Sequence, residues 1–265
     1  MMEKNIPEKL YIYFSKYKYL KTVIERSELF FNFANNSNDV FDSAINDSLL
    51  ICKCCPCGEE QIKDIIFCTP RKYKKEVREY LNNNKQYFGN INMALNALKL
   101  KLPRLIRQDI CCKIHKKYSK MQAKYRIAYF TEKNDSILMW AHYGNHLKGY
   151  CLELNTRKDP EFFKGIRKVE YSGKRYEKID EGLYFQKFTD WEYECEWRIA
   201  YNPATISKWE ENDDGYLPTK AISGIIIGER AFYKGPLSRI VKQKNMDCYI
   251  ATSDEKEYKI NIERL

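Results

Sequence analysis

Glu194, Glu196 and Arg198 alternate with other residues in the segment WEYECEWRI (residues 191–199), which has the clearest chemical pattern in the chain. If residues 194–201 form a β-strand, its two-residue period places these three side chains on one face. Two carboxylates beside an arginine can stabilise a developing cation, because the arginine holds one carboxylate in its ionised form. A solvated strand face with a surface ion pair has the same spacing, so both interpretations stay open at this point.

Trp140 and Tyr143 are the second pair of residues with a chemical interpretation. Residues 134–144 predict a short helix that begins at Asp135 or Ser136 as its cap and ends at Gly144. Side chains three residues apart share a helix face, so the two rings are expected to form an aromatic wall. The wall lines either a ligand site or the hydrophobic core.

The cysteine cluster CKCCPC (residues 52–57) suggests a metal site, but its spacing matches none of the common zinc or iron–sulfur sites. We therefore expect reduced cysteines and no metal. The histidines, which are His115, His142 and His146, lie in no recognisable nucleophile motif, and no phosphate-binding glycine loop is present. A phosphate-loop NTPase and a Rossmann dehydrogenase are thereby disfavoured.

Charge and composition limit the remaining classes. The net charge is +10, and lysines gather at Lys72, Lys74 and Lys75 and again at Lys113, Lys116, Lys117, Lys120 and Lys124. A polyanion such as nucleic acid could bind there, but solvated helix faces explain the lysines equally simply, and no nucleic-acid motif accompanies them. With ten cysteines in a long chain, no apolar leader and no membrane-length apolar run, we expect a soluble cytoplasmic protein without a membrane partner.

The elements that must position these residues form an α+β pattern. Residues 10–14 and 29–33 predict strands on either side of a helix over 17–26, and residues 62–124 predict a helical middle segment broken at Pro103. Later strands are predicted at 125–131, 149–154, 168–171, 194–201, 222–228, 248–251 and 258–262. Strands at both ends with helices between them imply that the N-terminal strand joins the later sheet. This favours one domain, residues 1–265, with mixed or antiparallel sheets.

Several motifs, read in order, resemble the bacterial family named domain of unknown function 2971. They are LYIY (10–13), the stretch 33–42 with Asn38-Asp39, MWAHYG (139–144) through Gly149, VEY (169–171), and Lys187 followed by WEYECEWR (191–198). The pattern spans most of the chain, and the W-A-H-Y and W-x-Y-E-x-E-x-R elements are its specific parts. Val40 departs from the proline that usually follows Asn-Asp in the family, and the 52–57 cysteines are a local peculiarity.

The overall plan is also similar to ADP-ribosyltransferase-like domains, in which NAD lies between two sheets and a late E-x-E strand carries the catalytic glutamate. This resemblance implies that Tyr13 holds the adenosine side and that Tyr143 or Trp140 stacks on nicotinamide. It further implies that Glu196 is catalytic and Glu194 orients the substrate, with Arg198 grouped among the residues that bind NAD.

The resulting hypothesis is an NAD-using ADP-ribosyltransferase-like enzyme, a toxin or phage-defence effector that acts on a protein or nucleic-acid target. Two alternatives remain. One is a non-catalytic module that binds nucleic acid or a nucleotide through its aromatic and basic surfaces. The other is a magnesium-dependent nuclease with Glu194 and Glu196 as metal ligands.

Overall fold

The computed structural model describes residues 6–36, 42, 59–84, 91–98, 101–122, 124–174, 176, 181–202, 215–232 and 234–265. These residues form two compact units, each assembled from separate stretches of the chain. Unit 1 contains Met1–Asn32, Arg126–Ser172 and Lys187–Leu265, and unit 2 contains Phe33–Tyr125 and Gly173–Gln186. The fold class is α+β, as the sequence predicts, and the assignment of 1–265 to one domain stays a prediction.

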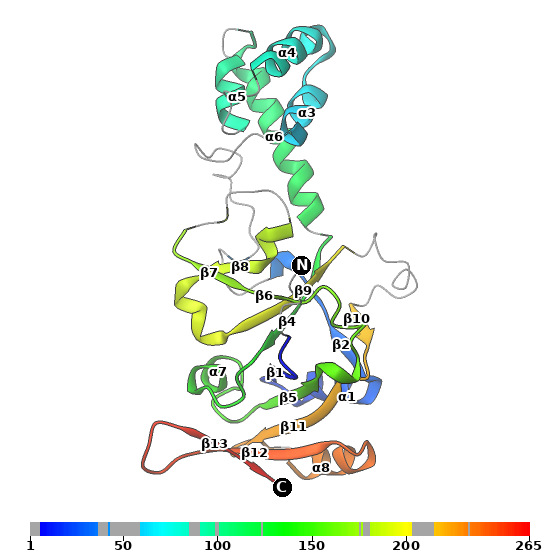
Figure 1. Ribbon diagram of the computed structural model, residues 1–265, viewed down its shortest axis with the longest axis vertical. Helices are drawn as coiled ribbons and strands as arrows, with labels where there is room; N and C mark the ends of the chain where they lie inside the picture. Colours follow the sequence, from blue (N-terminus) through cyan, green and yellow to red (C-terminus); the bar gives the residue numbers. More distant parts are fainter. Residues whose placement is uncertain are drawn as a thin grey trace. The chain divides into compact units, whose positions relative to one another are not determined.

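Unit 1 is built on a mixed β-sheet (Figure 1). The strands follow the order β13-β12-β11-β5-β1-β4-β9-β6 across the sheet. Their bounds are β1 (Lys9–Phe14), β4 (Arg126–Thr131), β5 (Tyr150–Asn155), β6 (Arg167–Lys168), β9 (Glu196–Tyr201), β11 (Ile222–Gly228), β12 (Asp247–Ser253) and β13 (Ile260–Arg264). β11 and β12 run parallel, and the other neighbours in this order pair antiparallel. The first strand in sequence thus lies inside a sheet made mostly of late strands, as expected.

Shorter elements complete unit 1. Two small two-stranded sheets pair β2 (Glu28–Phe30) with β10 (Tyr216–Pro218) and β7 (Glu170–Ser172) with β8 (Gln186–Phe188). The α-helices are α1 (Tyr17–Arg26), α7 (Ile137–His142) and α8 (Lys234–Gln243), and the 3₁₀ helices are η4 (Thr156–Lys158) and η6 (Thr189–Glu194). The strand β3 (Asn32–Phe33) lies where the chain leaves unit 1.

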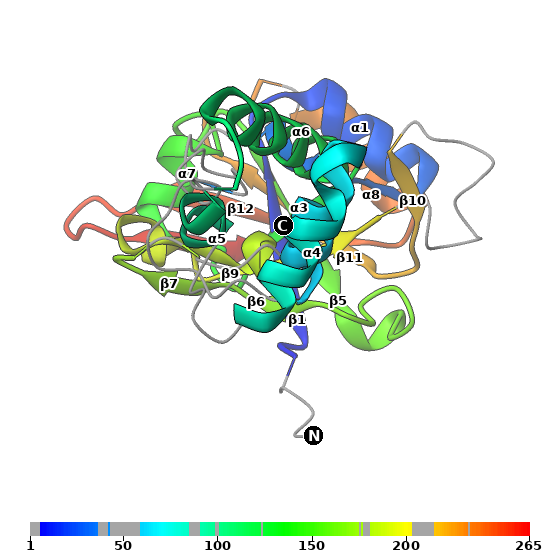
Figure 2. The ribbon, with the colours of Figure 1, turned by 90° about the horizontal axis from the view of Figure 1, so that it is seen from above.

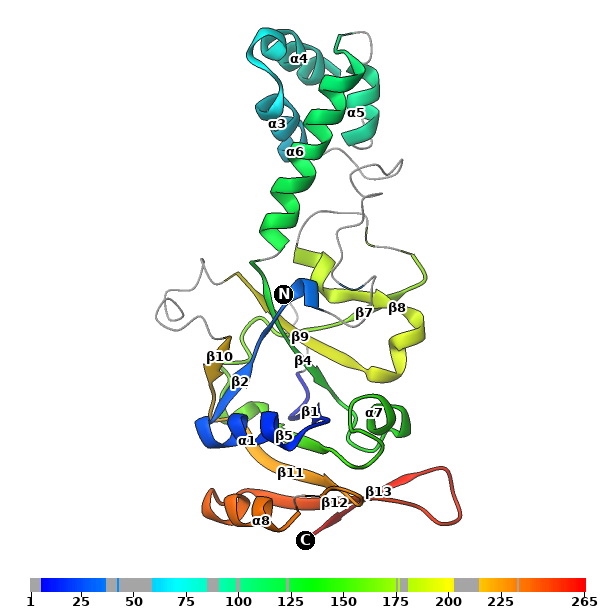
Figure 3. The same ribbon diagram turned by 180° about the vertical axis from the view of Figure 1, so that it is seen from behind.

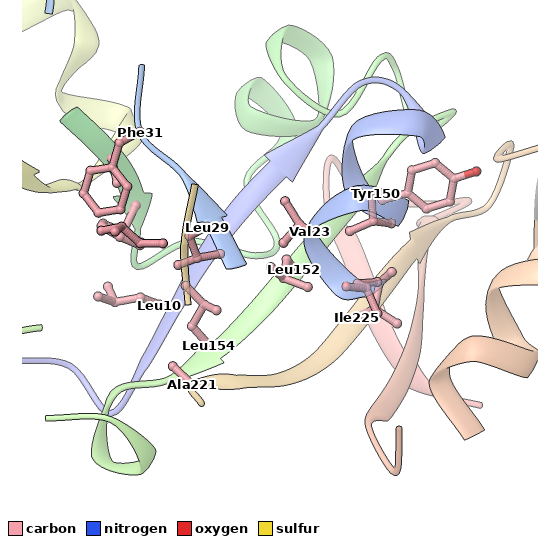
Figure 4. Packing of buried hydrophobic residues seen from close by; sticks show 14 of the residues in the cluster. Leu10, Val23, Leu29, Phe31, Tyr150, Leu152, Leu154, Ala221 and Ile225 are labelled. Atoms are coloured by element: carbon pink, nitrogen blue, oxygen red, sulfur yellow. The ribbon is translucent and has the colours of Figure 1, made fainter. Parts of the chain in front are cut away.

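The two faces of the large sheet differ in chemistry. One face carries the larger apolar cluster, to which α1 contributes Leu20, Val23 and Ile24 at helical spacing and α8 contributes Leu237 and Val241. Figure 4 shows residues of this cluster from β1, α1, β2, β5 and β11 in contact. α7 lies on the opposite side of the strands from α1 and α8 (Figures 1 and 2).

The face beneath α7 is aromatic and polar. It carries a smaller apolar cluster around Tyr11, Trp140 and Cys151. Since strand side chains alternate, β9 directs Trp197 and Ile199 to the larger cluster and leaves Glu196 and Arg198 on the α7 side. The sheet therefore separates the main core from a layer of ionisable side chains.

Unit 2 is helical. Its helices are α3 (Glu59–Cys68), α4 (Arg71–Asn84), α5 (Ile91–Ala97) and α6 (Arg104–Gln122), with the 3₁₀ helices η1 (Ala34–Asn36) and η5 (Glu181–Phe185). The four α-helices share one apolar cluster and pack together in Figure 3. α6 begins immediately after Pro103, which confirms the predicted helix break. None of the helices in the described part of the chain combines the length and apolar character needed to cross a bilayer.

Two of the predicted strands are each divided in the structure. The strand expected over 29–33 is two strands, β2 and β3, because the chain leaves its pairing with β10 at the fully buried Phe31. The strand expected over 168–171 is also two short strands, β6 and β7, which pair with different partners. The cysteine cluster 52–57 and Asn38, Asp39 and Val40 lie outside the described residues.

Candidate functional site

Lys187 lies at the centre of a buried ionic cluster in unit 1. Its Nζ is 2.5 Å from Oε2 of Glu194 and 3.2 Å from Oε2 of Glu196. Lys187 is 6% exposed, and both carboxyl groups are buried as well. A buried ammonium is unfavourable without a partner, and here it has two carboxyl groups within contact distance.

Glu196 and Arg198 form the ordered side of this cluster. Arg198 is 0% exposed and donates two bonds of 2.9 Å to Glu196, from Nε to Oε1 and from Nη2 to Oε2. Such a bidentate pair fixes both planar groups. Tyr129 lies directly opposite Arg198 in the β4–β9 register, and the arginine Cζ is 5.2 Å from the centre of its ring. Glu196 is thus held rigidly by two cationic side chains.

Glu194 reaches the cluster by a route that strand alternation does not describe. It is the last residue of η6, and β9 begins only at Glu196. Cys195 between them has φ 44° and ψ 52°, a left-handed conformation that is uncommon for a residue with a side chain. The side chain of Thr131 fixes this turn by donating a 2.5 Å bond to the Glu194 carbonyl. The predicted strand over 194–201 is therefore wrong at its first two residues, although Glu194, Glu196 and Arg198 do lie together.

The ionisation of the cluster follows from burial and charge. Burial lowers the pKa of Lys187, but the Glu196 and Glu194 carboxylates more than offset this, so its pKa lies above the ordinary value. Burial raises the pKa of Glu194, and the ammonium of Lys187 and the hydroxyl of Tyr143 offset only part of that effect. Lys187 is therefore a stable cation, and Glu194 takes up a proton more readily than an ordinary glutamate.

The C-terminal end of α7 connects this cluster to the protein surface, through Tyr143 and the exposed His142. The helix begins as predicted at Ser136, whose hydroxyl accepts the Met139 N–H bond at 3.3 Å. Tyr143, which directly follows the helix and is half-buried, donates a 2.5 Å bond from its hydroxyl to Oε1 of Glu194. Tyr143 is thus brought to Glu194, and its predicted role in binding NAD stays a prediction.

The exposed side chain of His142 extends this layer to solvent. Its Nδ1 lies 2.8 Å from the hydroxyl of Tyr193, and the two rings meet at 67°. Burial and the Glu194 carboxylate raise the pKa of Tyr193 to about 12. At neutral pH Tyr193 is therefore a neutral hydroxyl between the imidazole and the acidic cluster.

Trp140 and Tyr13 belong to the core beneath α7. Trp140 is 1% exposed, and its indole N–H donates a 2.8 Å bond to the Asn134 carbonyl. The Tyr13 ring meets it edge-on at 5.1 Å, and the Tyr13 hydroxyl donates to the Lys133 carbonyl at 3.0 Å. Neither face of the indole is open to a ligand, so the interpretation of Trp140 as a stacking platform does not fit its burial.

No family model, curated protein or solved structure matches the chain. Membership of the domain 2971 family and the likeness to ADP-ribosyltransferase-like domains therefore stay predictions that rest on the quoted motifs.

Lys187, Thr131 and Tyr171 are site residues that the pattern of alternating acids does not reveal. Tyr171 of β7 accepts a 2.8 Å bond at its hydroxyl from the backbone N–H of Glu196. Lys187 was part of the family pattern, but its position between the acids was not foreseen. The sequence feature that could have indicated this position is a single lysine within the aromatic segment LYFQKF (183–188), because a buried cation needs an acidic partner.

The other ionisable groups in the described part of the chain give no further candidate centre of this kind. Within the described residues, no group of three or more histidine, cysteine, aspartate or glutamate side chains is placed to hold a metal ion. Another buried acid, Glu153 on β5, is paired with Lys9 at 2.9 Å and accepts a 3.0 Å bond from Ser223. Each of its contacts joins neighbouring strands, so it stabilises the sheet.

Proposed function

We propose that this chain is an NAD-using enzyme of the ADP-ribosyltransferase-like type, with the Lys187 cluster as its catalytic centre. The observation that carries the proposal is one buried lysine shared by two carboxyl groups, one of which is also bonded to a half-buried tyrosine. Buried ionisable groups with shifted pKa values cost stability and gather at functional sites. The proposal includes membership of the domain 2971 family, the corresponding fold arrangement and a role as a toxin or phage-defence effector.

The chemistry suits two carboxyl groups of different character. Cleavage of the nicotinamide–ribose bond releases neutral nicotinamide and leaves positive charge on C1′ and the ring oxygen of the ribose. A carboxylate stabilises that charge more strongly than it stabilises the uncharged sugar, which lowers the barrier. Water or a target side chain then attacks C1′ and loses a proton, so no further reactant is required.

Within this proposal, Glu194 rather than Glu196 is the carboxylate that contacts the substrate. Glu196 already accepts two bonds from Arg198 and one from Lys187, so its geometry suits a positioning role. Glu194 accepts one bond from Lys187 and one from Tyr143, and no arginine of the described residues is bonded to its carboxyl group, so it is the less heavily bonded of the two acids. This reverses the two roles that the family resemblance implies, and it makes Tyr143 the aromatic residue nearest to the substrate.

The position of Lys187 disfavours the magnesium-nuclease alternative. A metal ion bound by Glu194 and Glu196 needs the space between their carboxylates, and the Lys187 ammonium lies there at 2.5 and 3.2 Å. Bringing in a dication would require the lysine to leave a buried position in which its pKa is raised. The site is therefore better suited to stabilising an organic cation than to binding magnesium.

Nicotinamide release from NAD tests the proposal directly. The purified full chain is incubated with NAD, and free nicotinamide is measured by chromatography for the wild type, Glu194→Gln and Glu132→Gln. Glu132→Gln is the matched control, since the part-buried Glu132 pairs with Lys168 at 2.7 Å outside the cluster, and glutamine keeps a side-chain oxygen to accept the bond from the Trp197 indole N–H. Loss of about 3 kcal/mol of transition-state stabilisation predicts about a hundredfold lower rate for Glu194→Gln.

Two results would overturn the proposal. One is a wild-type protein that releases no nicotinamide above the uncatalysed rate. The other is a Glu194→Gln variant that shows a wild-type circular dichroism spectrum and the same rate as the Glu132→Gln control. If Glu196→Gln loses activity while Glu194→Gln keeps it, the result still supports an NAD-cleaving enzyme. It would show, however, that Glu196 and not Glu194 is the carboxylate that contacts the substrate.

A further inference from the structure

Unit 2 contains an open pocket of about 470 Å³ between α3 and α4. Its volume lies in the range of small-molecule sites. The lining side chains are Ile62, Lys63, Ile66 and Phe67 of α3 and Lys74, Arg78 and Asn82 of α4. The pocket is thus built from two helices of a single unit.

The helix spacing explains why these side chains line one pocket. Lys74, Arg78 and Asn82 are each four residues apart, so they form one stripe along α4. Ile62 and Ile66 are also four apart on α3, and both belong to the apolar cluster of unit 2. The pocket therefore has an apolar floor and a polar, cationic wall.

Within the described residues, the cations of this wall have no acidic partner. Among the described side chains, no carboxylate lies within ion-pair distance of Lys63, Lys74 or Arg78. Two acids on these helices are paired with other lysines, Asp64 with Lys117 at 2.5 Å and Glu76 with Lys101 at 2.9 Å. Of the described residues, three cations and no acid line the pocket, which is complementary to an anionic ligand.

Phe67 adds a feature that a site for simple anions does not need. Its side chain is 78% exposed, which is unusual for a large apolar ring, and Lys74 Nζ lies 5.5 Å from the centre of the ring. An exposed ring beside cations is the arrangement by which proteins bind single-stranded nucleic acid, with bases stacked on the ring and phosphates at the cations. Acidic peptides offer charge but no flat aromatic partner for the ring.

We infer that the α3–α4 pocket of unit 2 binds single-stranded nucleic acid, with one base on Phe67 and the adjoining phosphates at Lys74 and Arg78. This site shares no residue with the Lys187 cluster, so nucleic-acid binding here can be tested independently of NAD cleavage. It accounts for part of the positive charge of the chain, because Lys74 belongs to one of the lysine groups in the sequence.

Fluorescence anisotropy with a labelled twelve-nucleotide oligouridine tests the inference on the full chain. The variants are Phe67→Leu, which keeps apolar volume but removes the aromatic ring, and the pair Lys74→Gln with Arg78→Gln. The matched control is Lys116→Gln with Lys120→Gln, which removes the same charge from exposed positions on α6. Circular dichroism verifies that each variant is folded.

The expected results differ between the variants. Phe67→Leu weakens binding at least about fivefold at constant salt, because one stacked base is lost. Lys74→Gln with Arg78→Gln weakens binding and makes the slope of log K against log salt shallower by about 1.4, since two phosphate contacts are lost. The α6 control leaves both the affinity and the slope within about twofold of the wild type.

Three outcomes would overturn the inference. The first is a wild-type protein that binds no oligouridine at 50 mM salt. The second is an α6 control that weakens binding as much as the α4 pair, which would show a response to net charge alone. The third is a Phe67→Leu variant with wild-type affinity, together with equal competition by polyglutamate, which would identify the pocket as a site for acidic peptides.

Discussion

Replacing Lys187 with methionine removes the cation from between two buried carboxyl groups while keeping a side chain of similar length. In the native protein, Nζ lies 2.5 and 3.2 Å from Glu194 and Glu196, and all three side chains are almost inaccessible. Arg198 still neutralises Glu196 in the variant, but Glu194 keeps only the hydroxyl of Tyr143. Breaking a buried ion pair from one side costs about 3–5 kcal/mol, and we expect a loss in this range at pH 7.

The loss of stability should depend on pH in a defined direction. The pKa of Glu194 is already raised in the folded state, and Lys187 holds it down, so the substitution raises it further. A group with a raised folded-state pKa stabilises the protein fully below its unfolded pKa, and this contribution is lost as the pH rises through the folded pKa. The raised pKa of Lys187 places the loss of its own contribution in alkaline solution, above its unfolded value near 10.4. The loss in free energy of unfolding caused by Lys187→Met should therefore be smallest near pH 4.5 and largest near pH 8.

Urea unfolding at pH 4.5, 6 and 8 measures this effect, with circular dichroism as the signal. Lys168→Met is the control, because Lys168 pairs with Glu132 at 2.7 Å but both side chains are partly exposed. Surface pairs of this kind contribute under about 1 kcal/mol. Adding Glu194→Gln to Lys187→Met removes the unpaired acid and should recover part of the loss at pH 8.

A stabilising role of the Lys187–Glu194 contact is refuted if Lys187→Met loses no more free energy of unfolding than Lys168→Met at pH 8. It is also refuted if the deficit is constant between pH 4.5 and 8, because an unpaired buried carboxyl group must respond to protonation. A double variant that is less stable than Lys187→Met at pH 8 would show that Glu194 is not the group left uncompensated.

Two further substitutions test the surroundings of the cluster. Gly144→Ala should lower the free energy of unfolding by about 1–3 kcal/mol, because an added Cβ would lie 2.4 Å from Cε3 of Trp140 and 3.0 Å from its backbone. Gly173→Ala is the control, since no atom lies within 4 Å of the added methyl group. Thermal denaturation should show no change in stability for this control. Tyr143→Phe removes the bond to Glu194, which lowers stability by about 1.5–3 kcal/mol and raises the pKa of that acid further. Its stability should therefore fall more steeply than that of the wild type between pH 4 and 8, and a parallel pH profile would contradict the assigned bond.

Local sequence patterns predicted the elements whose periodicity is strong. The helix over 17–26 has the expected bounds because Leu20, Val23 and Ile24 share one face and Ser27 ends it in a left-handed conformation. The opening strand was placed correctly, and its position inside the later sheet followed from the arrangement of helices between strands. The α+β class is confirmed on this basis.

The site was predicted only in part, for a physical reason. Alternation in one strand suggested that Glu194 and Glu196 lie together, but the left-handed Cys195 ends that alternation, and no local pattern marks a cysteine for that conformation. Lys187 comes from a different strand, so only tertiary structure shows that its ammonium lies between the two acids. Burial of Trp140 likewise depends on strands distant in sequence, which is why its role in the core and a role at a ligand site were indistinguishable.

The opposite chemistry of the two sheet faces also protects the chain against misfolding. A one-residue slip of β9 against β4 would drive Arg198 into the aliphatic layer and push Trp197 into the charged layer. Burying Arg198 among aliphatic side chains and exposing Trp197 to charged ones both raise the free energy of the shifted register. The native register is therefore strongly favoured over it. The buried pair of Glu196 and Arg198 therefore also favours the native register of β9 against β4.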